Sequence, residues 1–492
     1  MAIKMLINAI EKEEYRVALV NGDVLEGFYI ETAAKEEKVG NVYKAVVERI
    51  EPSLQACFVN FGSDKNGFLP INEIHPEYYR DGYDRKDGTA LPPIEKILKK
   101  GQELLVQVTK EMPGRKGAQL TTYLSFASRY LVLVPGGTGG VSKKIEDEEE
   151  RERLKSLINH LKLPEGVSVI VRTAAYKKSK KELSKDLNRL VRMWKKIKKE
   201  VKEAPVPSLI HKEQDICLRA LRDHFSSEVT EVLVDNREIY TKVKDYMKIV
   251  SPRHQRRVKL YRGEEPIFAH FSLEKQIDAI YANKVSLKSG GSIIIEPTEA
   301  LVSIDVNSGR GRSEKNIENT AYKTNMEAAA EIARQLRLRD MGGLIVIDFI
   351  DMKDKNHIRE IEKIFRESTK PDRAKISIAH ISKFGLLELS RQRLHPSIES
   401  RSYERCQYCQ GRGLVLSVES AAVSFLRQIW VGASQKNKHC IKGVLPLAVA
   451  NYLQNNKRKE LYDLETKYGV AINIEGDVTL PPGGGKLEFI AN

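Results

Sequence analysis

Two apolar runs that each end on an aspartate constrain this chain more than any other stretch. Residues 301–307 read LVSIDVN, and residues 343–352 read GLIVIDFIDM. Because side chains alternate between the two faces of a strand, Asp305 and Asn307 should share a face while Val306 points the other way. The four aliphatic residues before Asp348 predict a second strand, buried in an α/β sheet.

The two aspartates suit a particular kind of site. Carboxylates at the carboxyl ends of neighbouring strands lie where α/β proteins commonly build their functional sites. Two carboxylates are the usual protein ligands of Mg²⁺, which keeps waters for a substrate phosphate. The sequence therefore predicts a Mg²⁺ site for phosphoryl chemistry at Asp305 and Asp348. The alternative is that both aspartates only end strands and cap turns, and their spacing alone does not separate the two readings.

Charge and cysteine content narrow the class of protein. The chain has 492 residues, too many for one core, so three or more domains are expected. Its net charge of +15 indicates a polyanionic partner, either nucleic acid or an anionic membrane surface. Five cysteines are too few for a disulfide framework and indicate a reducing compartment. The sequence shows no signal peptide and no transmembrane segment, so a soluble cytoplasmic protein is expected.

Residues 39–122 contain short strand-like runs separated by glycines, a pattern typical of a small β-barrel. Such barrels bind single-stranded nucleic acid by stacking bases on exposed aromatic side chains beside basic groups. Phe58 and Phe68 are the candidate platforms, Phe61 lies close by, and Lys116 follows at the barrel exit. The alternative is that the phenylalanines fill the barrel core.

Two segments after the barrel carry positive charge. The strand predicted from Val167 ends on Arg172 and Thr173, and an arginine fork beside a hydroxyl suits a small anion. Residues 177–202 contain 12 Lys and Arg and repeat apolar residues at helical spacing, which predicts one long amphipathic helix. Its basic face either follows a phosphate backbone or is simply solvated.

Other segments give coarser expectations. Residues 1–38 form only short strands, too few for a core, and we expect residues 209–281 to complete that domain. Residues 383–393, KFGLLELSRQR, are expected to begin a helix with a basic end.

Cys406 and Cys409 form a CxxC pair followed by glycines, the shape of a zinc knuckle. A structural zinc needs four ligands, and no other Cys or His stands close by in the sequence. The pair therefore binds nothing, acts as a redox dithiol, or shares one zinc with the same pair of a second chain. The redox reading lacks the strand-to-helix context of a thioredoxin site. The shared site predicts a symmetric dimer.

Several long motifs occur together in one order: SIDVNSGR, EIARQLRLRDMGGLIVIDFIDM, HISKFGLLELSRQR and CxxCxGxG. Through them the chain resembles the bacterial ribonuclease E/G family of endoribonucleases. Only a short tail follows the CxxC, so the resemblance is closer to the ribonuclease G type, without the long scaffold tail that holds degradosome partners.

The resemblance implies an α+β multidomain fold. It has an RNase H-like fold, an inserted S1 (OB) β-barrel and 5′-sensor, a DNase I-like catalytic α/β subdomain, a zinc-link and a small C-terminal domain. The implied boundaries are 1–38 plus 218–281 for the RNase H-like domain, 39–122 for the S1 domain, 123–217 for the 5′-sensor, 282–402 for the catalytic subdomain, 403–416 for the zinc-link and 417–492 for the C-terminal domain.

The resemblance also implies site residues. Asp305 and Asp348 would bind Mg²⁺, and Asn307 would orient the first carboxylate. Phe58, Phe68 and Lys116 match positions that grip RNA near the cut. The 5′-monophosphate pocket would comprise Arg172, Thr173, Ser128 and Val132. Ser128 stands where some members have glycine, and Lys375 where some have arginine, which bears on the strength of 5′-end sensing. Cys406 and Cys409 would share Zn²⁺ between two chains.

The function implied is Mg²⁺-dependent cleavage of single-stranded RNA, in rRNA, tRNA and mRNA processing and decay. The products would carry a 5′-phosphate and a 3′-hydroxyl, and a 5′-monophosphate would stimulate the reaction. The implied partners are RNA and a second copy of the chain, in a homodimer that can pair into a dimer of dimers. The alternatives are a non-catalytic S1-type RNA-binding scaffold and a metal-dependent deoxyribonuclease.

Overall fold

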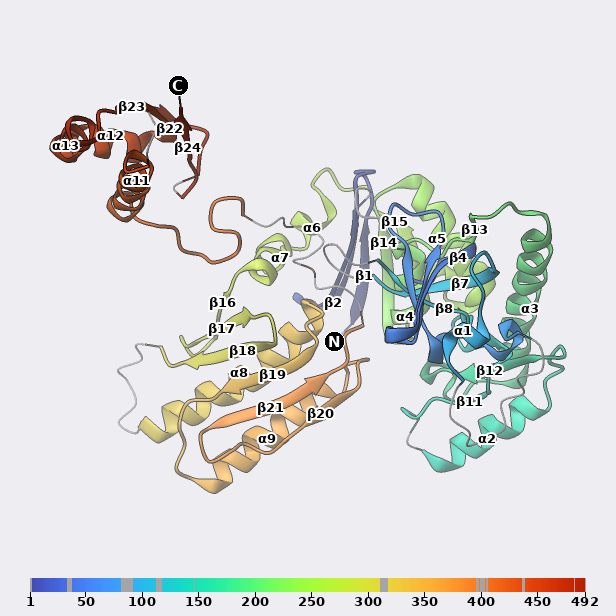
Figure 1. Cartoon of the computed structure of the whole chain (residues 1–492). Helices are drawn as coiled ribbons and strands as arrows, with labels where there is room; N and C mark the ends of the chain where they lie inside the picture. Colours follow the sequence, from blue (N-terminus) through green and yellow to red (C-terminus); the bar gives the residue numbers. More distant parts are fainter. Residues whose placement is uncertain are drawn as a thin grey trace. The chain divides into compact units, whose positions relative to one another are not determined.

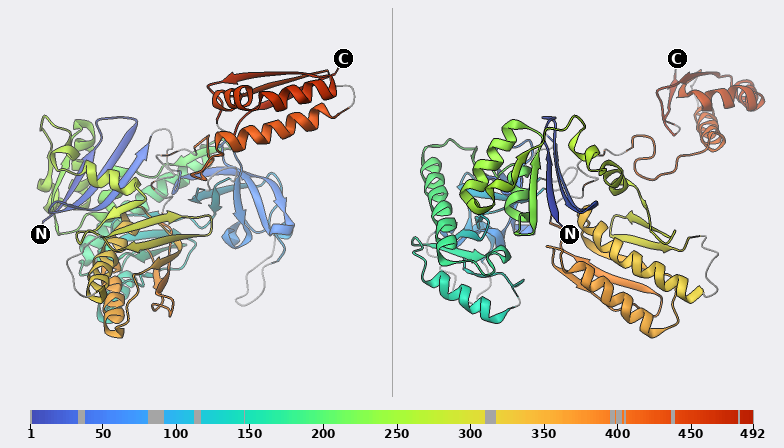
Figure 2. Two further views of the ribbon diagram at one scale, coloured as in Figure 1. Left: turned by 90° about the vertical axis from the view of Figure 1, so that its left-hand side faces the viewer. Right: turned by 180° about the vertical axis from the view of Figure 1, so that it is seen from behind.

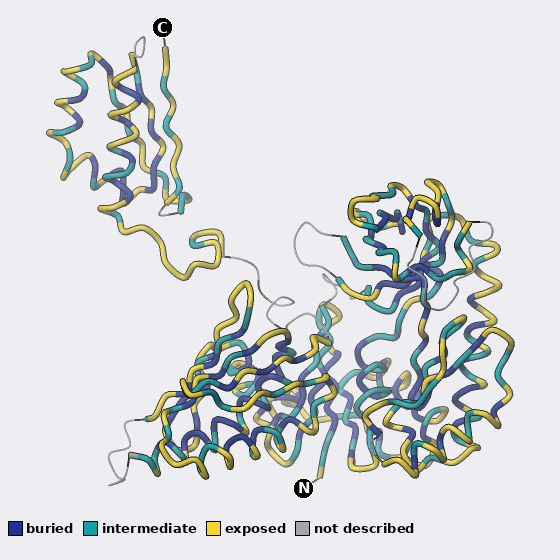
Figure 3. Tube along the Cα trace, turned by 60° about the horizontal axis from the view of Figure 1, so that its bottom comes forward, coloured by how far each residue is buried: buried dark blue, intermediate teal, exposed yellow. Residues whose placement is uncertain are grey.

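The computed structural model describes residues 2–491 except 33–37, 81–91, 112–116, 146, 310–316, 395–397, 399–402, 404–405, 436–438 and 482. It divides into two compact units, residues 1–402 and 403–492. Each unit has its own buried core, visible as dark-blue stretches of the chain (Figure 3). In the described part of the chain, no helix is both long and apolar enough to span a bilayer.

The first sheet joins the N-terminus to a distant segment. β1 (Ile3–Asn8) runs parallel to β14 (Val229–Val234), so strands from both segments form one five-stranded sheet (Figure 1). Helices α4 (Ile216–His224) and α5 (Arg237–Val250) contribute apolar side chains to its core. The strand order is β15 (Val258–Leu260), β14 (Val229–Val234), β1 (Ile3–Asn8), β2 (Glu14–Asn21) and β3 (Val24–Thr32).

The second sheet is a closed barrel, because β4 pairs with both β5 and β7. Closure removes the unpaired edges that an open sheet of short strands would expose. Phe61 is only 2% exposed in its core, so for this residue the core-filling alternative holds. The strands are β13 (Ser208–His211), β4 (Val42–Glu51), β5 (Ala56–Asn60), β6 (Gly67–Pro70), β8 (Gln119–Thr121) and β7 (Glu103–Lys110).

A third sheet follows the barrel along the chain. It carries the long helix predicted from residues 177–202, which the structure places at Lys180–Glu203 as α3. Ser179 and Glu182 form a capping box at its start, satisfying backbone N–H groups that have no partner within the helix. α2 spans Glu148–Asn159, and the strands are β11 (Gly140–Val141), β12 (Val167–Val171), β10 (Leu131–Pro135) and β9 (Phe126–Ala127).

The fourth sheet holds the two aspartate runs. Helices α8 (Ile317–Leu338) and α9 (Lys355–Thr369) share one hydrophobic core with the inward-facing residues of the sheet. The opposite face remains open, as the exposed Leu344 shows. The strand order is β16 (Lys284–Ser286), β17 (Ser292–Pro297), β18 (Leu301–Asn307), β19 (Gly343–Asp348), β21 (Leu386–Arg391) and β20 (Ile376–Ile378).

Two expectations for this sheet need correction. The predicted helix over residues 383–393 is wrong, because Leu386–Arg391 form β21, an antiparallel neighbour of β19. Its alternating burial reflects Leu387 and Leu389 facing the core while Glu388 and Ser390 face solvent. β19 is also not buried on both faces: Ile345 and Ile347 point inward, but Leu344 is 48% exposed.

The second unit is a three-stranded sheet with helices packed against it (Figure 2). β22 (Cys440–Pro446) is central, parallel to β23 (Ala471–Asp477) and antiparallel to β24 (Lys486–Ile490). The helices are α11 (Val418–Ala433), α12 (Leu447–Asn456) and α13 (Arg458–Tyr468).

Candidate active site and RNA-binding surfaces

The two aspartates lie side by side at the end of the fourth sheet. β18 and β19 are parallel, and Asp305 is the register partner of Asp348. Neighbouring strands are about 4.8 Å apart, so the two carboxylates share one small region of space. Val302, Ile304 and Val306 are buried while Asp305 and Asn307 are exposed, which confirms the predicted alternation. The inward β-branched residues fix the register and thereby aim both aspartates at the open face.

Electrostatics at this point favour a cation. Burial raises the pKa of Asp348, and the negative charges of Asp305 and Asp351 raise it further. The Asn307 amide donates a hydrogen bond of 2.7 Å to Asp305 Oδ2, and among the described residues the other carboxylate oxygen accepts no hydrogen bond. Crowded carboxylates of this kind fit Mg²⁺, which takes one or two protein carboxylates and keeps waters. Among the described residues, no group of three or more His, Cys, Asp or Glu side chains has metal-binding geometry.

Helix α8 holds the loop that follows Asp348. Asn325 is fully buried, and its amide both donates to Ile350 O at 2.8 Å and accepts from Ile350 N at 3.1 Å. Glu318 accepts the backbone N–H groups of Lys353 and Asp354, each at 3.1 Å. The sequence interpretation missed both residues. Nothing local in the sequence distinguishes Asn325 from the other buried polar residues of this helix, Thr324 and Gln335.

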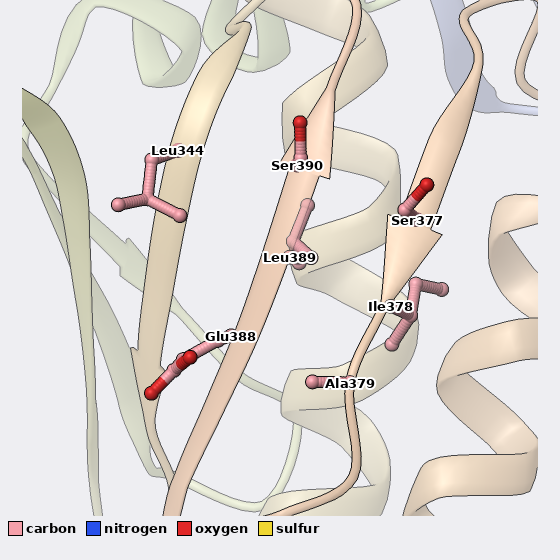
Figure 4. Close-up of a pocket in the computed structure, with 7 residues that line it drawn as sticks. All are labelled: Leu344, Ser377, Ile378, Ala379, Glu388, Leu389 and Ser390. Carbon is pink, nitrogen blue, oxygen red and sulfur yellow. The ribbon is translucent and has the colours of Figure 1, made fainter.

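A shallow pocket of about 310 Å³ lies on the same open face. Figure 4 shows Leu344 on β19 beside Glu388 and Ser390 on β21. Leu344 precedes Asp348 by four residues, or about 13 Å at the usual rise of a strand. The pocket therefore does not coincide with the aspartate pair, which sits at the rim of the sheet.

The barrel presents the two phenylalanines together. Phe58 on β5 is the register partner of Phe68 on β6, and their ring centroids are 6.0 Å apart in an edge-to-face arrangement. Both side chains are half-buried. The Arg49 guanidinium lies 4.9 Å from the Phe58 ring centroid. Paired rings beside a cation suit stacked bases and phosphates. Lys116 lies outside the described residues.

Arg172 occupies a cluster of guanidinium groups. Its Nη2 donates to Asp223 Oδ1 at 2.6 Å, and its Nη1 donates to the Ser128 carbonyl at 2.7 Å. Arg222 and Arg373 also approach the Asp223 carboxylate, at 3.2 and 3.7 Å. Burial alone would raise the pKa of Asp223, but the arginines hold it well below its usual range. Asp223 was missed from the sequence, because nothing local pairs it with a residue 51 positions away.

The other residues expected in the 5′-phosphate pocket differ in how far they are exposed. Thr173, which directly follows Arg172, is exposed. Val132 is half-buried on β10, and its register partner on β12 is Ile170. The Ser128 hydroxyl is buried and donates a hydrogen bond to Asp186 Oδ1 at 2.5 Å, so it is bonded within the protein interior. Lys375 is exposed.

Cys406 and Cys409 lie in a tight turn of the second unit. Gln410 N donates to Cys406 O at 2.8 Å, and Arg412 N donates to Cys409 O at 2.9 Å. Backbone N–H groups of Gly413 and Gly411 lower the pKa of the Cys409 thiol, which favours the thiolate that zinc requires. α11 begins only at Val418, so the pair does not sit at a helix N-terminus as a thioredoxin dithiol does.

Comparison with known proteins identifies the parts of the chain. Residues 125–394 match the ribonuclease E/G family, and residues 36–122 match the S1 RNA-binding domain. Residues 405–488 match the "RNase E/G, Thioredoxin-like domain". The expected S1 barrel is thereby confirmed.

Similar proteins extend the match to nearly the whole chain. It is 48% identical to ribonuclease E of Haemophilus influenzae and 45% identical to ribonuclease E of Escherichia coli, over 96% and 94% of its length. It spans only about half of those relatives, 50% and 44%. Ribonuclease G of Escherichia coli is 36% identical over 96% of this chain and 97% of the relative. Identity is thus higher with the ribonuclease E relatives, and shared length is more complete with ribonuclease G. The chain belongs to the ribonuclease E/G family.

Proposed function

We propose that this protein is an endoribonuclease that cleaves single-stranded RNA with the help of Mg²⁺. The observation that carries the proposal is the register pairing of Asp305 with Asp348 at the open rim of the fourth sheet. The closed S1 barrel with its paired phenylalanines supplies a surface suited to single-stranded RNA. The net charge of +15 favours a polyanionic substrate.

The chain's own residues would position the reaction. Asp305 and Asp348 would hold the metal, and Asn307 would keep the Asp305 carboxylate in one orientation through its hydrogen bond. A Mg²⁺ ion held there would lower the pKa of a bound water and would offset negative charge on the phosphate. Hydrolysis in which water adds to phosphorus and the 3′-oxygen leaves would give a 5′-phosphate and a 3′-hydroxyl. Asn325 would keep the loop after Asp348 from moving as charge develops.

The remaining assignments follow the same proposal. Residues 1–38 and 218–281 would form an RNase H-like domain, and residues 282–402 a DNase I-like catalytic subdomain. The guanidinium cluster around Arg172, with Thr173 exposed beside it, supports a site for a 5′-monophosphate on the RNA. Substrates would be rRNA, tRNA and mRNA precursors, and the site of action would be the cytoplasm.

A comparison of RNA with DNA tests the proposal. We expect a single-stranded oligoribonucleotide to be cut in Mg²⁺, and to stay intact in EDTA. The deoxyribonucleotide of the same sequence should stay intact in both. Cleavage products should ligate through a 5′-phosphate. Binding of RNA without cleavage in Mg²⁺ would instead favour a scaffold, and cleavage of DNA would favour a deoxyribonuclease.

The CxxC turn supports a zinc ion shared by two chains. Two thiolates in one turn supply half of a tetrahedral site, so a second copy would complete it in a homodimer, which could pair further into a tetramer.

Replacing Cys406 by serine should release zinc and dissociate the dimer, as measured by elemental analysis and light scattering. Cys440→Ser is the matched control, because Cys440 is half-buried on β22 of the same unit. Its zinc content and mass should remain those of the wild type. A Cys406→Ser protein of unchanged mass and zinc content would refute the shared site.

A further inference from the structure

A tight turn between β20 and β21 reaches the same end of the sheet as the aspartate pair. Leu386, the first residue of β21, is the register partner of Asp348. Directly opposed residues of an antiparallel pair point to the same face, so Leu386 lies beside Asp348, and the turn meets β21 at the end of the sheet that carries the carboxylates. A Cβ atom on Gly385 would lie 3.3 Å from Asp351 Oδ1, so the turn packs closely against the loop that follows β19.

Phe384 is unusually exposed at the tip of this turn. The chain has 13 phenylalanines, all of them described, and twelve are buried or half-buried. Phe384 is 71% exposed. Leaving a whole aromatic ring in water forgoes about 2 kcal/mol of burial that the other phenylalanines obtain. The ring therefore contributes little burial to the fold, and its place in a turn at the aspartate end of the sheet suits a contact with a ligand.

The turn holds Phe384 in a defined place. Ser382 N donates to Leu386 O at 2.8 Å, and Gly385 N donates to Ser382 O at 3.0 Å. Gly385 adopts φ +80°, a conformation that favours glycine. Ile381 N donates to Glu362 Oε1 on α9 at 2.7 Å, which ties the start of the turn to the helix layer. A ring held this way loses little conformational freedom when it binds a ligand.

The charge beside the ring matches RNA. Lys383 Nζ lies 5.0 Å from the Phe384 ring centroid, and the ring is exposed enough for a base to stack on it. Asp305, Asp348 and Asp351 give this end of the sheet negative charge that repels phosphates. Lys383 is positively charged and would attract an RNA phosphate next to the scissile one, which offsets the repulsion of that phosphate by the aspartates.

We propose that Phe384 stacks on a nucleobase adjacent to the scissile phosphate and that Lys383 contacts a neighbouring phosphate. The inference rests on the proposed ribonuclease function and adds a base-binding position to it. The ring acts as a positioning residue, because it anchors the nucleotide whose phosphodiester the aspartates address.

The test combines Phe384→Ala with RNA that lacks single bases. Wild-type protein and the variant are compared on one oligoribonucleotide with a single known cut site, and on copies with an abasic nucleotide at each position around it. Phe384→Ala should lower kcat/KM about tenfold on intact RNA, as loss of one stacked base would. At one position, the abasic substitution should lower wild-type kcat/KM by a similar factor and have almost no further effect on Phe384→Ala. Phe384→Trp should restore most of the activity, and Phe384→Leu should not.

A control variant distinguishes base stacking from a general loss of exposed apolar surface. Ile249→Ala removes a similarly exposed apolar side chain, 63% exposed on α5, and should keep wild-type kcat/KM. Wild-type kcat/KM for Phe384→Ala, or an abasic effect that is the same in both proteins at every position, would overturn the stacking role. A change in oligomeric mass would also overturn it and assign the ring to an interface between chains.

Failure of the proposed function would look different, since the wild-type protein itself would then leave RNA uncut. In that case a 2-aminopurine base in the RNA still reports the contact. Its fluorescence should be quenched by the wild-type protein and not by Phe384→Ala, and equal quenching by both proteins would refute the stacking.

Discussion

Asp305→Asn is expected to lower RNA cleavage on the order of 10³-fold while leaving RNA affinity within about twofold. The substitution keeps the size of the side chain and its hydrogen bond with Asn307, but it removes the negative charge that attracts Mg²⁺. Loss of metal stabilisation by several kcal/mol corresponds to such a factor, at about 1.4 kcal/mol per tenfold. Affinity should persist because it rests on the barrel aromatics and the positive surface.

Single-turnover cleavage and fluorescence anisotropy with the same RNA measure the two quantities. Ser303→Ala is the matched control, since Ser303 lies on the same face of β18 two residues earlier. It should cleave at the wild-type rate. Asn307→Ala should fall between them, with a 10- to 100-fold loss typical of a residue that orients a metal ligand. Cleavage by Asp305→Asn at the wild-type rate would remove Asp305 from the site.

The face on which Asp305 and Asn307 lie could be predicted because its signal is local. Strand alternation assigns Asp305 and Asn307 to one face from seven consecutive residues, and the structure shows the same alternation. The long helix α3 was equally accessible, since its apolar residues recur at helical spacing and Ser179 and Glu182 mark its start. Both elements obey rules that depend only on nearby residues.

Features set by distant contacts could not be predicted in this way. Residues 386–391 have good helix formers, Leu and Glu, yet pairing with β19 makes them a strand. Phe61 and Phe58 look alike in the sequence, but the closure of the barrel buries the first and leaves the second half-exposed. Asp223 reaches Arg172 only after two distant segments fold together.

The guanidinium cluster also connects parts of the first unit that lie far apart in the sequence. Arg172 follows β12, Asp223 lies on α4, and Arg373 precedes β20 of the sheet that carries the aspartates. A phosphate that draws Arg172 away from Asp223 would leave that carboxylate to Arg222 and Arg373. This network is therefore a physical link between the proposed 5′-phosphate pocket and the sheet that carries the aspartate pair.

The second large effect concerns the stability of that sheet. Arg391, on β21, is 2% exposed and donates to Asp372 Oδ2 at 2.9 Å, to Asp340 Oδ1 at 3.0 Å and to the Met341 carbonyl at 2.6 Å. Burial alone would lower the pKa of Arg391, but hydrogen bonds and charge from the two aspartates raise it. Asp372 is itself 3% exposed. Removing Arg391 would leave this carboxylate buried without its cation.

Arg391→Met should therefore destabilise the sheet that carries the aspartate pair by about 3–5 kcal/mol. Hydrogen exchange in peptides covering β20 and β21 should speed up by roughly 10²–10⁴-fold at amides that exchange when the sheet opens. Arg393→Met is the matched control: Arg393 is exposed two residues later, and its loss should change exchange less than fivefold. Adding Asp372→Leu to Arg391→Met should restore part of the protection from hydrogen exchange. The reason is that most of the lost stability comes from burying the Asp372 carboxylate without a cation, not from losing its attraction to Arg391. A double variant as unstable as Arg391→Met would show instead that the guanidinium's bonds to Asp340 and the Met341 carbonyl carry the stability.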